Sequence, residues 1–200
     1  MNPVVLSGIL ITIAYLFGSL SSAIIICKIF GLGDPRMQGS KNPGATNVLR
    51  LHGKKYAAMV FIGDMLKGTI PVVIGHLFAV SIPMLGWIAF AAIIGHMYPI
   101  FFGFKGGKGV ATALGSFFGL NFFLGLTCLA TWIITAYVKK YSSLASLVTI
   151  CLAPLFAINY MKTATIFSPM LFISIIIIAH HHENIQRIWR GEESKISFKK

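Results

Sequence analysis

The sequence predicts an all-α polytopic membrane protein with seven transmembrane helices, some of them short, and with polar cytoplasmic loops that form the active site. Three observations predict this fold class. The hydrophobic fraction of the 200 residues is 56%, and only 11% are charged. Apolar runs of about 20 residues recur, which is the helix length that crosses the hydrocarbon core. The formal net charge is +12, an excess that basic residues on the cytoplasmic side of membrane spans explain better than nucleic-acid binding does.

Six apolar runs account for the predicted spans. They cover residues 4–27, 57–80, 84–102, 110–138, 144–160 and 166–179. The first run has no basic segment before it and no small-residue cleavage site, so we expect a membrane span and not a cleaved signal peptide. No linker interrupts the chain, and we expect one integral-membrane domain over residues 1–200, with a loosely ordered polar tail from about residue 191.

The 29-residue run at 110–138 decides the topology. As a single span, it would carry Lys139 and Lys140 to the side opposite the glycine–lysine loop at 103–109. As two short helices that turn at 119–125, it returns them to the same side. This second reading gives seven spans, with the N-terminus outside and the C-terminus cytoplasmic. Fifteen of the 17 lysines and arginines then lie inside, as the positive-inside rule requires.

Residues 39–50 are the polar stretch around which the rest of the chain is arranged. They include two glycines, two asparagines, a serine, a threonine, a lysine and an arginine. This composition is typical of a loop that wraps an anion with backbone N–H groups, hydroxyls and a guanidinium. We therefore interpret the stretch as an anion-binding loop.

The glycine–lysine loop at 103–109 is a second candidate phosphate site. It does not match the nucleotide-binding P-loop, because Phe102 and Gly109 stand where that motif needs Gly and Ser or Thr. Its glycines, its two lysines and the start of a helix near Val110 nevertheless offer N–H groups and positive charge to an anion. The alternative is a basic turn whose glycines serve tight packing.

Asp64, Lys67 and His96 are ionisable residues inside apolar runs, where charges are costly, and each is a candidate for a functional role. Asp64 and Lys67 are three residues apart and can meet on one helix face. We expect a neutralising ion pair, with two functional alternatives: the pair orients the loops, or Lys67 reaches a phosphate. For His96, a structural hydrogen bond to a neighbouring loop is favoured over catalysis. All three are supporting residues of the predicted site.

The segment at 180–184 reads His-His-His-Glu-Asn. His181 and Asn184 are three residues apart and are predicted to face one pocket, with His182 and Glu183 pointing elsewhere. Ser40 and His181 are candidates for a nucleophile and its base, but no third triad member is evident. No His/Cys spacing indicates a metal site, and no cofactor is expected.

At these clusters the sequence resembles the bacterial PlsY family, the acyl-phosphate-dependent glycerol-3-phosphate acyltransferases. The resemblance runs from the first span to the tail, with the motifs in the family's order and spacing. It is carried by Gly39, Ser40, Asn42, residues 44–50, 64–68, 95–99 and 104–112, His181 and residues 183–185.

The resemblance implies a seven-helix inner-membrane enzyme with a cytosolic active site. Such an enzyme transfers a fatty acyl group from acyl phosphate to the 1-hydroxyl of glycerol 3-phosphate, giving lysophosphatidic acid and phosphate. By position, it implies a catalytic group that holds glycerol 3-phosphate: Ser40, Arg50, Lys108, His181 and Asn184. It also implies an acyl-phosphate site: Gly39, Asn42, Gly44, Thr46, Asn47, Lys105, Gly106 and Gly107.

Two positions depart from the family pattern. Lys41 stands where the family usually has Gly, and His182 stands where it usually has Arg. If the backbone at position 41 needs a positive φ angle, a lysine there is strained.

The substrate suggests the mechanism. An acyl phosphate is already activated, so direct transfer needs only proximity, charge stabilisation and a proton acceptor. We expect a substrate phosphate to accept the proton; the alternative makes His181 the general base. A membrane transporter of a phosphorylated solute is the competing function, although the outer half of the chain offers few polar residues for it.

Overall fold

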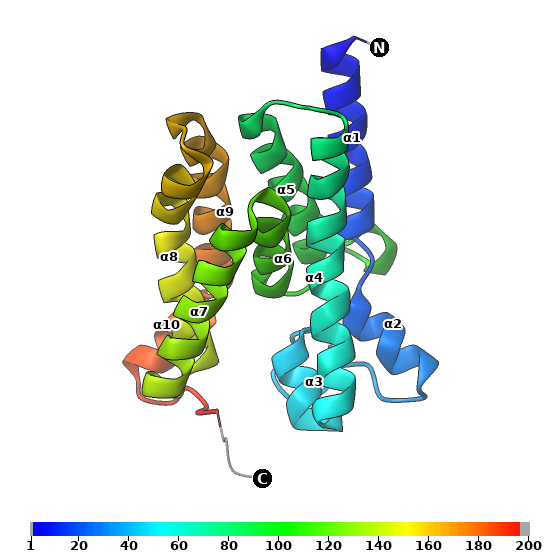
Figure 1. The fold of residues 1–200 in the computed structure, drawn as a ribbon. Coiled ribbons are helices and arrows are strands. Elements are labelled where there is room, and N and C mark those ends of the chain that lie inside the picture. The colour runs from blue at the N-terminus through cyan, green and yellow to red at the C-terminus, as the bar shows by residue number, and fades with distance from the viewer. Residues whose placement is uncertain (1, 197–200) are drawn as a thin grey trace.

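The computed structural model describes residues 2–196, which contain only helices and connecting loops, with no strand (Figure 1). The helices are α1 (Pro3–Gly18), α2 (Ser22–Ile29), α3 (Ala45–His52), α4 (Lys54–Leu77), α5 (Ile82–Met97), η1 (Ile100–Phe102), α6 (Val110–Leu120), α7 (Phe122–Lys139), α8 (Ser142–Met161), η2 (Ala164–Ile166), α9 (Phe167–His180) and α10 (His182–Trp189). The predicted all-helical class is confirmed.

The number of candidate membrane spans in the described chain is four to six. Four helical segments are long and apolar enough: Lys54–Leu77, Ile82–Phe102, Phe122–Lys139 and Ser142–Met161. Two bent pairs, α1 with α2 and α9 with α10, bring the number to six if each pair is one span. A seventh span requires α6, whose 11 residues cover only about 16 Å of the roughly 30 Å hydrocarbon core.

The long apolar run at 110–138 is divided as expected. α6 ends at Leu120 and α7 begins at Phe122. Asn121 between them is the N-cap of α7, and its side-chain oxygen accepts hydrogen bonds from the N–H groups of Phe123 and Leu124. The turn lies short of the end of the bundle at which α8 and α9 are joined (Figure 1).

The first apolar run, expected as a span over residues 4–27, is bent in the structure. α1 ends at Gly18, α2 begins at Ser22, and the two helices are bent by 42°. Gly and Ser residues at the break favour such a bend. The carbonyl oxygen of Leu20, left outside both helices, accepts a hydrogen bond from the Lys67 ammonium at 2.9 Å.

Small residues let the central helices approach closely. A Cβ atom added to Gly115 of α6 would lie 2.0 Å from the carbonyl oxygen of Met65 in α4, and one added to Gly18 of α1 would lie 2.1 Å from that of Ala92 in α5. Backbone contact through small residues is a principal way in which helices associate in a lipid environment. These contacts place α4 and α5 at the centre of the bundle.

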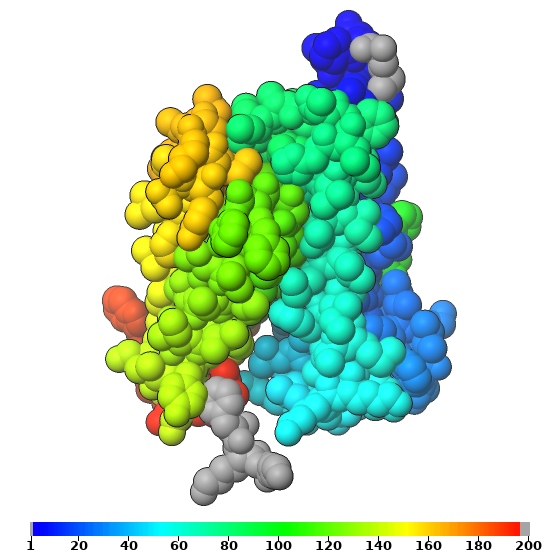
Figure 2. Space-filling view, viewed as in Figure 1, coloured from blue at the N-terminus to red at the C-terminus, as the bar shows by residue number. Residues whose placement is uncertain are grey.

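The polar segments gather at one end of the molecule. α1 begins at the opposite end, while α2 and α3 lie near the lower end of α4, and α10 lies near the lower end of α7 (Figure 1). On the face shown in Figure 2, the surface at this end is hollowed between α7 and the α3–α4 side.

The close approach of α4 and α6 makes a testable prediction. Gly115→Ala places a methyl group against backbone that cannot move aside, so we expect a loss of about 1–3 kcal/mol in the free energy of unfolding. Unfolding in detergent micelles measures it. Gly8→Ala is the matched control, because a Cβ atom at Gly8 would have no neighbour within 4 Å; equal stability of the two variants would contradict the packing argument.

Candidate active site

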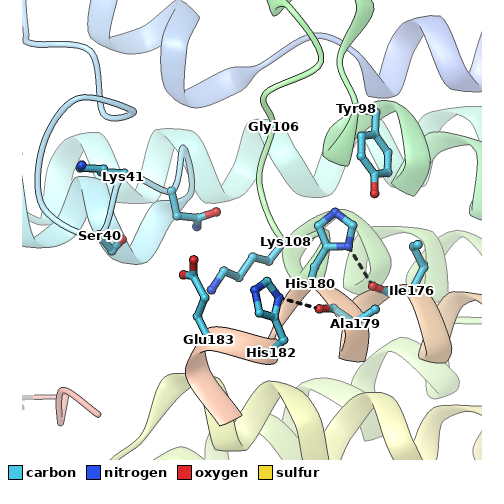
Figure 3. A pocket seen from close by; sticks show the side chains of 11 residues that line it. Ser40, Lys41, Tyr98, Gly106, Lys108, Ile176, Ala179, His180, His182 and Glu183 are labelled. Carbon is cyan, nitrogen blue, oxygen red and sulfur yellow. Dashed lines mark hydrogen bonds between the residues drawn. The ribbon is translucent and has the colours of Figure 1, made fainter. Parts of the chain in front are cut away.

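A cavity of about 530 Å³ lies at the polar end of the bundle (Figure 3). Three chain segments form it: the loop before α3, the connection from α5 to α6, and the junction of α9 with α10. Its lining consists of Ser40, Lys41, Asn42, Tyr98, Gly106, Lys108, Ile176, Ala179, His180, His182 and Glu183. The structure thus brings together three of the polar clusters that the sequence singled out.

The loop before α3 is shaped by Asn47. Its side-chain oxygen accepts a hydrogen bond from the N–H of Ser40 at 3.0 Å, and its amide nitrogen donates to the carbonyl oxygens of Pro35 and Gln38 at 2.9 and 3.1 Å. Asn47 is only 1% exposed and does not belong to the described cavity lining. It therefore holds Ser40 in place, whereas the sequence assigned Asn47 to the acyl phosphate itself.

A hydrogen bond from an arginine side chain joins this loop to the next one. Arg36 donates to the carbonyl oxygen of Phe102 at 3.0 Å and pairs with Asp34 at 2.7 Å. Hydrogen bonds from Arg36 lower the pKa of the Asp34 carboxyl. Neither Asp34 nor Arg36 was among the predicted site residues, because nothing local in this loop indicates that Arg36 contacts Phe102, 66 residues further along the chain.

Lys41 has a φ angle of 57°, so the position does adopt the left-handed conformation that favours glycine. A non-glycine residue in this conformation costs about 1–2 kcal/mol. Three other predicted residues of the stretch do not belong to the described lining. Gly44 is the N-cap of α3, while Thr46 and Arg50 are exposed and do not belong to the described lining.

The second loop is held by backbone hydrogen bonds. The N–H groups of Gly106 and Gly107 donate to the carbonyl oxygens of Met97 and His96 at 3.1 and 3.2 Å. They are therefore not free to cradle a phosphate, which corrects the expectation of open N–H groups at this turn. Lys105 is exposed outside the described lining, whereas Lys108 extends into the cavity (Figure 3).

A buried charged cluster supports this loop from behind. Lys67 and Asp64 form the expected ion pair at 2.9 Å, with side chains 4% and 2% exposed. His96 lies 3.5 Å from the same carboxylate oxygen. A Cβ atom on Gly107 would lie 2.2 Å from Nε2 of His96, so the loop rests directly on the imidazole. The cluster is set back from the described cavity lining, which favours the reading that it orients the loops.

Lys108 is connected to the C-terminal segment through Asn184. The Lys108 ammonium donates to the Asn184 side-chain oxygen, and the Asn184 amide donates to Glu193 at 2.7 Å. Glu193 also accepts hydrogen bonds from Ser143 and Arg187, each at 2.7 Å. Burial lowers the pKa of Lys108, and the nearby charge of Arg187 adds to the effect.

Glu193 is a functional candidate that the sequence analysis missed. Burial would raise the pKa of its carboxyl, but the hydrogen bonds from Ser143, Arg187 and Asn184 outweigh this and hold the pKa below its usual range. The N–H of Ile196 also bonds to the carbonyl oxygen of Lys140 at 2.7 Å. Glu193 and Ile196 of the tail that was expected to be loosely ordered from about residue 191 therefore contact the rest of the protein; residues 197–200 lie outside the described chain.

The junction of α9 and α10 corrects another expectation. His182 and Glu183 line the cavity, whereas His181 and Asn184 are 3% and 8% exposed and lie behind it. The spacing of His181 and Asn184 predicts a shared face only on a straight helix. α9 and α10 are bent by 58° at His181, and His182 and Glu183 line the cavity instead.

His181 is held as a neutral imidazole. Burial lowers its pKa to about 4. Its Nδ1 lies 2.8 Å from the carbonyl oxygen of Ile177, which can only accept, so Nδ1 carries the proton and Nε2 keeps a lone pair.

The buried ion pair makes a prediction about stability. Asp64→Asn leaves the Lys67 ammonium buried without a counter-charge, so we expect a loss of about 3–5 kcal/mol in the free energy of unfolding. The double variant Asp64→Leu with Lys67→Met removes both charges and should recover most of that loss. Unfolding in detergent micelles tests both; Lys54→Met, an exposed lysine of α4, is the control. A double variant no more stable than Asp64→Asn would contradict the argument.

Comparison with known proteins shows which family this chain is similar to. The family model described as Glycerol-3-phosphate acyltransferase matches residues 8–191. A Glycerol-3-phosphate acyltransferase of Shewanella sp. (strain ANA-3) is 50% identical over 200 residues, covering 100% of this chain and 98% of the relative. One from Legionella pneumophila (strain Corby) is 48% identical over 190 residues, covering 95% of this chain and 69% of the relative.

Two solved structures share the fold. The glycerol 3-phosphate form of PlsY (YgiH), an integral membrane glycerol 3-phosphate acyltransferase, has a TM-score of 0.90 and 40% identity, with 96% of each chain covered. The lysophosphatidic acid form has a TM-score of 0.88 and 39% identity, with 96% of this chain and 95% of that chain covered. From its polar clusters, its helical membrane fold and these similarities, this chain belongs to the glycerol-3-phosphate acyltransferase family.

Proposed function

We propose that this protein transfers a fatty acyl group from acyl phosphate to the 1-hydroxyl of glycerol 3-phosphate, the first step of phospholipid synthesis. The products are 1-acyl-glycerol 3-phosphate and phosphate. The observation that carries the proposal is the cavity itself, which joins Ser40 and Lys108 from two loops at the polar end of a membrane bundle in a chain that belongs to this family.

The reaction requires no covalent enzyme intermediate. The 1-hydroxyl oxygen attacks the acyl carbonyl carbon, the bond between that carbon and the phosphate oxygen breaks, and the hydroxyl proton passes to a phosphate. The enzyme has to hold two anions side by side and stabilise the charge that develops. Lys108 supplies positive charge inside the cavity, and the neighbouring loop segments supply polar groups.

The proposed roles are based on which residues line the cavity. Ser40 and Lys108 contact glycerol 3-phosphate directly, and Asn184 positions the Lys108 ammonium. Asn42 lines the same space and contacts the acyl phosphate, and Gly106 forms the wall beside it. Arg50 is exposed on α3 and engages a phosphate once substrate is bound.

The membrane arrangement forms part of the proposal. The protein resides in a bacterial cytoplasmic membrane, with the N-terminus outside and the C-terminus and active site cytoplasmic. α6 counts as the seventh crossing, its short length offset by the neighbouring helices. Membrane lipids surround the apolar exterior, and neither a cofactor nor a nucleic acid takes part.

One assay separates this function from that of a transporter. Purified protein in lipid nanodiscs is given glycerol 3-phosphate with acyl phosphate, acyl-CoA or acyl-carrier protein, and lysophosphatidic acid is measured. We expect product from acyl phosphate. No product from this donor would overturn the proposal, and uptake of glycerol 3-phosphate into proteoliposomes would favour the transporter.

The proton acceptor can be assigned with His181→Asn. If the substrate phosphate accepts the proton, the variant keeps most of kcat, and its rate falls with decreasing pH as in the wild type, since a phosphate has its second pKa near ~6. If His181 is the base, kcat falls by about 10²–10⁴-fold. Profiles of kcat against pH for both proteins decide the matter; a collapse of kcat would exclude substrate-assisted transfer.

Glu193 is proposed to position Lys108 through Asn184. Glu193→Gln weakens a charged hydrogen-bond network worth about 1.5–3 kcal/mol per bond, so we expect the KM for glycerol 3-phosphate to rise about tenfold with a smaller change in kcat. Steady-state kinetics with each substrate varied measures the split. Glu192→Gln, at an exposed neighbouring residue, is the control; equal kinetics in the two variants would rule out this role.

A further inference from the structure

Lys41 occupies a conformation that its residue type disfavours. Its φ angle is 57°, and its N–H donates to the carbonyl oxygen of Gln38 at 3.0 Å, which closes the turn immediately before Asn42. Strained residues of this kind persist where the surrounding structure holds them and are concentrated at functional sites.

The side chain stands at the rim of the cavity. Lys41 belongs to the lining but is exposed, and in Figure 3 it extends away from Lys108. Within residues 2–196, its ammonium forms no ion pair or hydrogen bond with the protein. Lys108, by contrast, lies deeper and is already bonded to Asn184.

The charge balance of the cavity depends on this residue. The charged residues of its lining are Lys41, Lys108 and Glu183, so the formal charge is +1 when the histidines are neutral. Without Lys41, the lysine and the glutamate that remain would cancel. A neutral wall is a poor receptor for a phosphate dianion, since a positive rim raises the local concentration of an approaching anion.

We propose that Lys41 is a specificity-determining residue that captures the phosphate dianion of the water-soluble substrate at the mouth of the cavity. This inference rests on the proposed function and assigns the rim to glycerol 3-phosphate. That substrate arrives from water, whereas the acyl phosphate carries an apolar chain and arrives from the bilayer. The strained backbone holds the ammonium at the rim, and Ser40 and Lys108 take over the dianion further in.

The test separates the charge of Lys41 from its backbone conformation. Lys41→Gln removes the charge and keeps the strain, Lys41→Asn removes the charge in a residue that tolerates positive φ, and Lys41→Arg keeps both. Lys28→Gln, an exposed lysine of α2, is the control. Each protein is studied in nanodiscs of uncharged lipid, so that the lipid surface adds no field of its own.

We expect Lys41→Gln and Lys41→Asn to raise the KM for glycerol 3-phosphate about threefold to tenfold, the effect of one unit charge near a dianion in water. Lys41→Arg and the control should stay within about twofold. The KM for acyl phosphate should be unchanged, and the increase of the glycerol 3-phosphate KM with ionic strength should be weaker in the two uncharged variants.

Three results would overturn the proposal. The KM for glycerol 3-phosphate could be unchanged in both uncharged variants, or only the KM for acyl phosphate could change. A KM for glycerol 3-phosphate that rises in Lys41→Gln but is normal in Lys41→Asn would assign the effect to the backbone. Calorimetric binding of glycerol 3-phosphate alone to wild type and Lys41→Gln keeps the test independent of turnover. If the wild type binds glycerol 3-phosphate but forms no product, the proposed function is disproved. The comparison of binding between wild type and Lys41→Gln still tests the role of Lys41.

Discussion

The buried ion pair between Asp64 and Lys67 is the constraint on which the polar end of this membrane bundle depends. A charge inside a membrane protein is costly unless it is paired, and here both partners are almost completely buried. Both residues also contact segments other than α4. The Lys67 ammonium bonds to the backbone at the break between α1 and α2, and the Asp64 carboxylate faces His96 of α5. One cluster therefore fixes the relative positions of three segments, and the loop that carries Lys108 rests on it.

Besides this ion pair, two further polar side chains hold the residues that line the cavity. Asn47 fixes the loop of Ser40, and Glu193 reaches Lys108 through Asn184. Asn47 and Glu193 are buried or half-buried, and their polar groups form hydrogen bonds with other parts of the protein. Ser40 and Lys41, whose side chains form no hydrogen bond within residues 2–196, line the cavity. Such a division between holding and contacting residues suits a reaction in which positioning and charge stabilisation do most of the work.

The helical class, the division of the long apolar run and the convergence of the polar clusters could be predicted from the sequence, because all three follow from hydrophobic length and the distribution of basic residues. Details set by tertiary contacts could not. The spacing of His181 and Asn184 was interpreted on a straight helix, and the bend at His181 reversed which residues line the cavity. Nothing local to Glu193 indicates Ser143, 50 residues away. The Gly106–Gly107 turn looked open because its backbone partners belong to α5.

The most direct test of the central claim is an experimental structure of this protein with glycerol 3-phosphate bound. We expect the phosphate in the cavity, within hydrogen-bonding distance of Ser40 and Lys108, with the ion pair of Asp64 and Lys67 intact behind the loop. A phosphate bound by the Lys67 ammonium, or one held outside the cavity, would contradict the assignment of supporting and contacting residues.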